Sequence, residues 1–113
     1  MASVNKKIVL GRLGQDPKQS FTKSGNEVSN FSVATYEKIK RNDVYEEETD
    51  WHRVAAFGAQ AKFINEYCKK GTLVYIEGKD KNREYKNKDG ETIKFNEMIV
   101  YNVQLTKSKN SEQ

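Results

Sequence analysis

Cysteine, histidine and proline are each represented only once in this chain of 113 residues. Because Cys68 has no second cysteine to join, neither an intrachain disulfide nor a cysteine-based metal cluster can form. A catalytic pair of Cys68 with the lone His52 would lack an orienting partner. No run of about 18 apolar residues occurs, so no membrane-spanning helix is expected. These absences predict a cytoplasmic protein without enzymatic activity, metal ion or cofactor.

Charged residues make up 32% of the chain and hydrophobic residues 35%, which allows one modest core beneath a heavily charged surface. Lysine and arginine number 20 against 16 acidic residues, a formal net charge of +4. Such a surplus is typical of proteins that bind polyanions, but many other proteins carry it too. The length suits a single domain, and neither repeats nor low-complexity segments interrupt it.

Apolar stretches and turn signals predict an all-β fold with one helix. Strands are expected over residues 4–13, 28–37, 49–57, 73–85 and 92–105, and a helix over 59–70 with Gly71 as its C-terminal cap. Residues 38–48 are a loop or a protruding hairpin arm. Three strands, a helix and two strands are the element order of the five-stranded Greek-key barrel called the OB-fold. We expect this domain over residues 1–106, followed by a short, polar, disordered tail over 107–113.

The segment around Trp51 is the most informative part of the chain. In a strand, Trp51, Arg53 and Phe57 share one face, while His52 and Val54 share the other. Two aromatic rings beside a guanidinium can stack on nucleic-acid bases and hold a phosphate. Alternation alone leaves the opposite assignment open, in which Trp51 and Phe57 fill the core and Val54 points outward.

A second candidate surface lies on the strand predicted over residues 73–85. Lys79, Lys81, Arg83 and Tyr85 alternate onto one face, which would form a basic row ending in a stacking ring. The same lysines would also suit a solvated hairpin that avoids edge aggregation. Lys38, at the start of the segment over residues 38–48, is a further candidate for a backbone contact.

Four motifs follow one another along the chain: Gly11-Arg12-Leu13-Gly14, Asp50-Trp51-His52-Arg53-Val54, Phe57-Gly58 and Tyr75-Ile76-Glu77-Gly78. In these motifs and their order, the chain resembles the bacterial-type single-stranded DNA-binding proteins over roughly residues 3 to 106. The resemblance implies an OB-fold that binds single-stranded DNA with little sequence preference during replication, recombination or repair. It also implies a homotetramer and a place on the nucleoid. Residues 8–10 are our candidate for the subunit contact, with His52 nearby.

The resemblance assigns stacking to three aromatic residues: Trp51, Phe57 and Tyr85, the last at a position where the family has tryptophan. The complete set of expected DNA contacts is Trp51, Phe57, Tyr85, Arg53, Lys79, Lys81, Arg83, Arg12, Lys38 and Lys70.

The chain departs from the family pattern in two places. Ile39 stands where many members have an aromatic residue, although Tyr36 is close by. Residues 107–113 lack the acidic, hydrophobic tip that recruits replication and repair enzymes, so we expect no such recruitment. Three alternatives stay open: an OB-fold adaptor that binds proteins, an RNA binder of the cold-shock type, and an OB-fold nuclease.

Overall fold

A computed structural model describes residues 2–106, and the predicted tail over residues 107–113 lies outside the described residues. Six strands and one helix make up the described part of the chain. In order they are β1 (Lys7–Leu13), β2 (Lys18–Phe21), β3 (Glu27–Arg41), β4 (Val44–Phe57), α1 (Ala59–Tyr67), β5 (Leu73–Lys86) and β6 (Thr92–Leu105).

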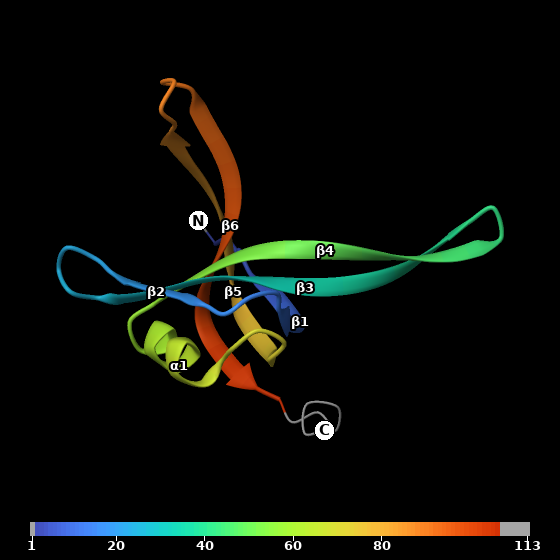
Figure 1. Cartoon of the computed structure of the whole chain (residues 1–113), viewed down its shortest axis with the longest axis horizontal. Helices are drawn as coiled ribbons and strands as arrows, with labels where there is room; N and C mark the ends of the chain where they lie inside the picture. Colours follow the sequence, from blue (N-terminus) through green and yellow to red (C-terminus); the bar gives the residue numbers. More distant parts are fainter. Residues whose placement is uncertain (1, 107–113) are drawn as a thin grey trace.

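Five of the strands, namely β1, β5, β6, β4 and β3, form a closed barrel, whose arrangement can be followed in Figure 1. The strand order is β1-β5-β6-β4-β3-β2, and β1 also pairs with β3, which closes the ring. This closure consists of two residue pairs, Arg12 with Ala34 and Leu13 with Val33. β4 and β6 run parallel, and the other pairings are antiparallel. The predicted five-stranded barrel with one helix is therefore confirmed.

The sixth strand, β2, was not predicted. All four residues of Lys18–Phe21 are exposed, so the segment carries no apolar alternation that would reveal a strand. β2 pairs only with the first part of β3, outside the closed ring. Its position places the β1–β2 loop beside the middle of β4, where the candidate site lies.

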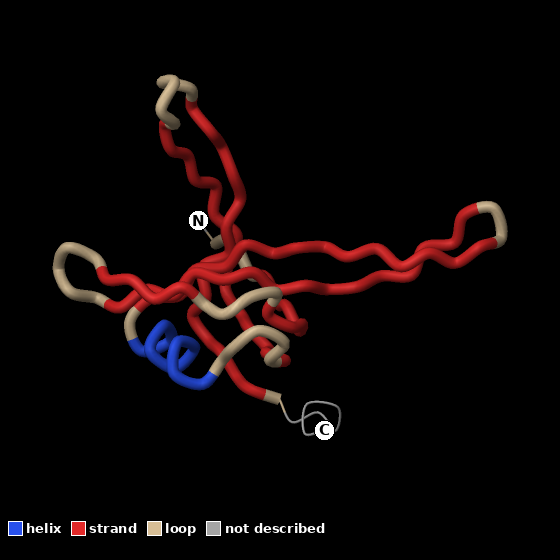
Figure 2. The backbone as a smooth tube through the Cα atoms, in the orientation of Figure 1, coloured by secondary structure: helices blue, strands red, loops and turns tan. Residues whose placement is uncertain are grey.

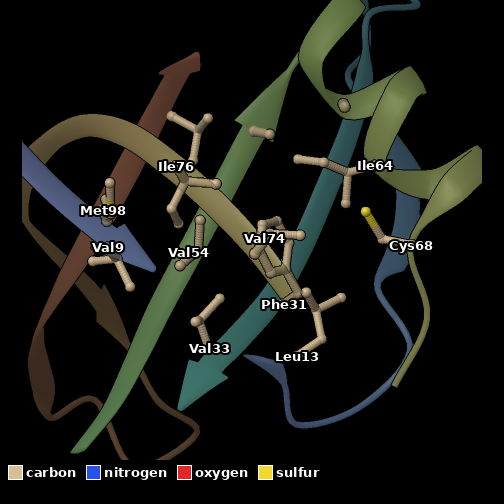
Figure 3. Packing of buried hydrophobic residues seen from close by; sticks show 13 residues of the cluster. Val9, Leu13, Phe31, Val33, Val54, Ile64, Cys68, Val74, Ile76 and Met98 are labelled. Atoms are coloured by element: carbon tan, nitrogen blue, oxygen red, sulfur yellow. The ribbon is translucent and has the colours of Figure 1, made fainter. Parts of the chain in front are cut away.

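The core is filled by alternate side chains of the barrel strands and by one face of α1 (Figure 3). Val54 of β4, Ile76 of β5 and Met98 of β6 are fully buried. Ile64 of α1 and Cys68 just beyond it close the group from the helix side. Burying one such aliphatic side chain stabilises the fold by about 1.5–3 kcal/mol, so these residues fix which face of each strand points inward.

Two long hairpins extend beyond the barrel (Figure 2). β3 and β4 continue in register out to the pair Arg41 and Val44, so residues 38–48 form a hairpin arm. Asn42 and Asp43 occupy its tip with φ angles of 50° and 63°, a conformation that asparagine and aspartate tolerate well. β5 and β6 form the second hairpin, which turns at Asn87–Glu91.

The helix ends earlier than predicted. α1 stops at Tyr67, and Cys68 is already extended, with φ −109° and ψ 147°. Gly71 has φ 89° but does not cap the helix, because it belongs to a tight turn in which Thr72 N donates to Lys69 O at 3.0 Å. That part of the prediction was wrong. Within residues 2–106, no helix has the length and apolar character needed to cross a membrane.

Candidate nucleic-acid interface

The outward face of β4 carries the aromatic residues singled out in the sequence. Trp51 is 61% exposed and Phe57 is 40% exposed, while Val54 is fully buried. This burial decides between the two assignments that alternation left open: the aromatic side chains point outward. Ala55 lies between Arg53 and Phe57 but is buried, because β3 and β6 flank it at Asn30 and Ile99.

A hollow of about 540 Å³ adjoins Trp51 and Arg53, within the size range of small-molecule sites. It lies between β4, the start of β2 and the loop that joins β1 to β2. Its lining mixes aromatic, amide, hydroxyl and charged groups with backbone: Gly14, Gln15, Asp16, Lys18, Asn30, Phe31, Ser32, Trp51 and Arg53. Such a hollow can take a planar base against the indole with a phosphate near the cationic side chains.

Arg53 is connected to the β5–β6 hairpin through an aromatic residue that the sequence reasoning missed. The guanidinium lies 4.6 Å from the ring centroid of Phe95, and Tyr85 meets the same ring edge-on at 5.9 Å. Phe95 stands opposite Arg83 in the β5–β6 register. Arg83 and Phe95 are equally far in sequence from Asp89, the centre of the predicted turn at Lys88-Asp89-Gly90, so a hairpin register centred there would have predicted this pair.

The basic row predicted on β5 is present, but its members differ in whether their charge is already paired. Lys79 and Lys81 are exposed, and Tyr85 is 55% exposed. Arg83 instead forms an ion pair with Glu97, with Nε 3.6 Å from Oε1, and the Glu97 side chain is only 9% exposed. Arg83 therefore already has a carboxylate partner, whereas Lys79 and Lys81 form no ion pair within residues 2–106.

The β3–β4 arm extends the Trp51 face with two further aromatic residues. Tyr36 is 58% exposed and Tyr45 is 68% exposed. Tyr36 pairs with Thr49, and Tyr45 with Lys40, whose ammonium group lies 5.7 Å from the tyrosine ring centroid. Both tyrosines have the same strand parity as Trp51 and its partner Ala34. Tyr45 was not identified from the sequence.

Much of the charge on the arm is internally paired. Arg41 lies 3.0 Å from Glu48 and 3.6 Å from Glu46, and Lys40 lies 3.8 Å from Asp43. Lys38 stands opposite Glu47 in the β3–β4 register. Residues 38–48 have three basic and four acidic side chains, so the arm offers aromatic surface without surplus positive charge.

Arg12 and Lys70 lie apart from this face. The Arg12 guanidinium donates to Gly71 O at 2.9 Å, and the Lys70 backbone N–H donates to Asp16 Oδ1 at 2.8 Å. Both residues line a different hollow, next to Leu105 and Thr106. The structure therefore brings together Trp51, Phe57 and Arg53 with the β5 row, but not Arg12 and Lys70.

The surroundings of His52 and Cys68 fit structural roles for both residues. His52 Nε2 lies 2.9 Å from Thr35 Oγ1, and burial lowers the pKa of the imidazole. Burial also raises the pKa of the Cys68 thiol to about 11, which keeps it protonated at neutral pH. In the described part of the chain, no group of three or more histidine, cysteine or acidic side chains is placed to hold a metal ion.

Comparison with known proteins gives consistent matches. A family model described as "Single-strand binding protein family" matches residues 4–106. Two proteins named "Single-stranded DNA-binding protein", from Neisseria meningitidis serogroup A and serogroup B, are each 45% identical over 89 residues. A solved structure titled "Plasmodium falciparum SSB complex with ssDNA" superposes with a TM-score of 0.86 at 27% identity.

The matches differ in how much of each protein they cover. The superposition includes 95% of this chain and 98% of the Plasmodium chain. The Neisseria alignments include 78% of this chain but 51% of each relative, so the chain spans about half the length of the curated relatives it matches.

Proposed function

The chain belongs to the single-strand binding protein family, and we propose from this premise that it binds single-stranded DNA without sequence preference. The observation that supports the proposal most directly is the outward face of β4. Trp51 and Phe57 are exposed there on either side of Arg53, and Trp51 and Arg53 line a hollow. Much of each ring is left exposed by the fold, and bases can stack on this exposed surface.

Two physical effects supply the affinity. Stacking of a base on an aromatic ring contributes about 1–3 kcal/mol and tolerates any base, since every base has a π-face. Lysine and arginine side chains neutralise phosphates and release counterions, which makes binding salt-dependent. A duplex hides its base faces, so the stacking part selects single strands. No bond in the nucleic acid has to be made or broken.

The proposed contacts fall into two groups. Trp51, Phe57, Tyr85, Arg53, Lys79, Lys81 and Lys38 form the direct set, joined by Tyr36 and Tyr45 of the arm. Arg83 acts mainly by holding the hairpin through Glu97. Arg12 and Lys70, also predicted as contacts, line a separate hollow, which supports a peripheral position for them.

Assembly into a homotetramer is part of the proposal. Ile8 and Leu10 are each 54% exposed on β1, whose residues Lys7 to Gly11 pair only with β5 within residues 2–106. The open edge and the exposed apolar side chains together suit pairing with a second copy. Joined subunits would let one strand contact several sites at high effective concentration.

The cellular role extends the same proposal. Coating of single strands serves replication, recombination or repair, on the nucleoid in the cytoplasm. We propose that the binding domain spans residues 1–106, and the end of β6 at Leu105 supports this boundary. The expectation that the chain does not recruit enzymes through a C-terminal tip concerns residues 107–113, which lie outside the described residues.

A fluorescence titration tests the proposal. Oligo(dT), oligo(U) and duplex DNA are each added while Trp51 emission is followed; Trp51 is the only tryptophan, so the signal has one source. We expect quenching and tight binding with oligo(dT), and much weaker binding to duplex. Preference for oligo(U) would indicate an RNA binder, and no binding to any of the three would favour a protein adaptor. Degradation of the oligonucleotides would indicate a nuclease.

The matched variants are Trp51→Ala and Tyr67→Ala. Tyr67, at the end of α1, is 58% exposed, similar to Trp51, but lies off the β4 face. We expect Trp51→Ala, followed by oligonucleotide anisotropy, to weaken binding by about 1–3 kcal/mol, and Tyr67→Ala to leave it unchanged. Equal affinity of parent and Trp51→Ala would contradict the proposed site.

A further inference from the structure

Gly14, in the loop between β1 and β2, lies against the indole of Trp51. A Cβ atom placed on Gly14 would lie 2.8 Å from Trp51 Cη2, still closer to Trp51 Cζ3, and 3.2 Å from Ser32 Oγ. Cη2 and Cζ3 are on the outer edge of the six-membered ring. The edge of the indole therefore occupies the space in which any other residue would carry its side chain.

The backbone conformation does not explain the glycine. Positive φ angles occur in the described glycines at Gly25, Gly58, Gly71 and Gly90, and Gly14 is not among them. Alanine could adopt the same conformation at position 14 without backbone strain. The close approach of the Trp51 ring is thus the physical reason for the missing side chain.

The loop side of this contact is held firmly. Gly14 N donates to Ser32 O at 3.0 Å, and Pro17 fixes one backbone angle three residues later. Asp16 Oδ1 accepts the Lys70 N–H at 2.8 Å, which ties the loop to the segment after α1. The Trp51 ring, in contrast, is 61% exposed, so fewer atoms of the protein resist its displacement. A side chain at position 14 would therefore displace the ring and leave the loop in place.

We propose that Gly14 is a positioning residue for Trp51: its bare backbone holds the indole edge and so aims the ring face at the hollow beside Arg53. A ring that is already oriented loses less rotational freedom when a base stacks on it, which raises affinity without any new contact to DNA. The effect on binding rests on the proposed function above. The contact between Gly14 and Trp51 does not, so it can be tested without DNA.

The first experiment is a thermal-unfolding and emission cycle with Gly14→Ala, Trp51→Ala and the double variant. We expect Gly14→Ala to lower the unfolding temperature of the parent and to shift Trp51 emission to longer wavelength, because the ring moves into water. In the Trp51→Ala background, the same change should have almost no effect on unfolding. Unchanged emission in folded Gly14→Ala, or equal destabilisation in both backgrounds, would overturn the proposal.

The second experiment measures oligo(dT) affinity by anisotropy in the same variants, with Tyr67→Ala as a control that lies off the β4 face and leaves the ring contact intact. Trp51→Ala should weaken binding roughly 5- to 150-fold, the equivalent of about 1–3 kcal/mol. In the parent, Gly14→Ala should weaken binding almost as much as Trp51→Ala does. In the Trp51→Ala background it should change affinity by less than about twofold, because the contact through which Gly14 acts is already lost. Equal losses in both backgrounds would show that Gly14 acts independently of the ring.

Two further outcomes have defined meanings. If Gly14→Ala fails to fold but the double variant folds, the clash with the indole is established and the proposal stands. If neither folds, Gly14 serves the backbone and the proposal falls. If the parent protein does not bind oligo(dT), the proposed function fails, while emission and unfolding still decide the Gly14–Trp51 contact.

Discussion

Lys81 and Arg83 lie two residues apart on the same face of β5, yet within residues 2–106 only Arg83 forms an ion pair. Lys81 is exposed, so Lys81→Ala should reduce the slope of log affinity against log salt by about 0.7, the value for one lost phosphate contact to a single strand. Arg83 already neutralises Glu97 at 3.6 Å, so Arg83→Ala should change the slope by less. Oligo(dT) titrations over a series of salt concentrations measure both.

Stability provides the control for this pair. Arg83→Ala leaves the Glu97 carboxylate, 9% exposed, without its cation and should lower the unfolding temperature. Adding Glu97→Gln should restore part of that loss, whereas Lys81→Ala should leave the unfolding temperature nearly unchanged. A slope change of full size for Arg83→Ala would show that the ion pair opens to bind phosphate.

His52 gives the fold a pH dependence. Burial and the nearby charge of Lys7 lower the pKa of the imidazole, against the opposing effect of Asp50 and Asp80. The unfolded chain therefore takes up the proton first as pH falls. Stability is fully present above the ordinary histidine pKa of about 6.5 and is lost as pH falls through that value toward the lower folded pKa.

We expect the Tm of the parent to fall from about pH 7.5 to about pH 5.5 more steeply than that of His52→Gln. Calorimetry of the two proteins across this range makes the comparison. Thr35→Val is a useful control, because it removes the 2.9 Å partner of His52 but keeps the imidazole. Parallel curves of Tm against pH for the parent and His52→Gln would mean that the pKa of His52 is the same in the folded and the unfolded chain.

At the scale of elements, the β3–β4 arm is the part that the sequence described least well. Its apolar pattern is interrupted by acidic and basic residues, so a loop and a hairpin were equally compatible with residues 38–48. The turn at Asn42 and Asp43 sets the register, in which Tyr45 is on the same face of β4 as Trp51. This pair has a lower turn preference than Asn-Gly, so the turn was harder to predict.

If the arm extends the stacking surface, Tyr45→Ala should weaken binding of a long oligo(dT) by roughly 1 kcal/mol and leave a short oligonucleotide centred on Trp51 unaffected. The length dependence follows because Tyr45 lies six residues along β4 from Trp51. Anisotropy with two lengths of oligo(dT) measures it. Val44→Ala, on the opposite face and 58% exposed, is the matched control. An equal loss for both lengths would contradict a role confined to the arm.

The other elements were predicted to different degrees, for identifiable reasons. The barrel strands carry buried apolar residues such as Val74 and Ile76, which strand alternation reveals, and the fold was predicted correctly. The exposed side of Trp51 required the family resemblance as well. β2 was missed because it has no buried residue. Phe95 was missed because its position beside the basic row follows only from its pairing with Arg83 across the hairpin. The predicted DNA contacts themselves stay predictions until they are measured.

For the whole molecule, the exposed apolar residues of β1 suggest how copies join. We expect light scattering at micromolar concentration to give a mass near that of a tetramer, well above the 13.0 kDa of one chain. Leu10→Lys should lower the measured mass, because it places a charge on the open edge at a 54% exposed position. Val4→Lys, 90% exposed and outside β1, should leave assembly intact. A mass of one chain for the parent would contradict the proposed assembly.

The closure of the barrel by two residue pairs also has a dynamic consequence. β1 and β3 meet only at Arg12–Ala34 and Leu13–Val33, so this seam is held by far fewer hydrogen bonds than the long β3–β4 and β5–β6 ladders. β4 and β6 are joined by two residue pairs as well, so the barrel has two short joins, and local opening seen by amide hydrogen exchange should begin at these. Gly14 and Trp51 lie at the end of the β1–β3 seam. A base stacked on Trp51 would therefore slow amide exchange at one of the two short joins, so that binding at the surface makes the ring of strands more rigid.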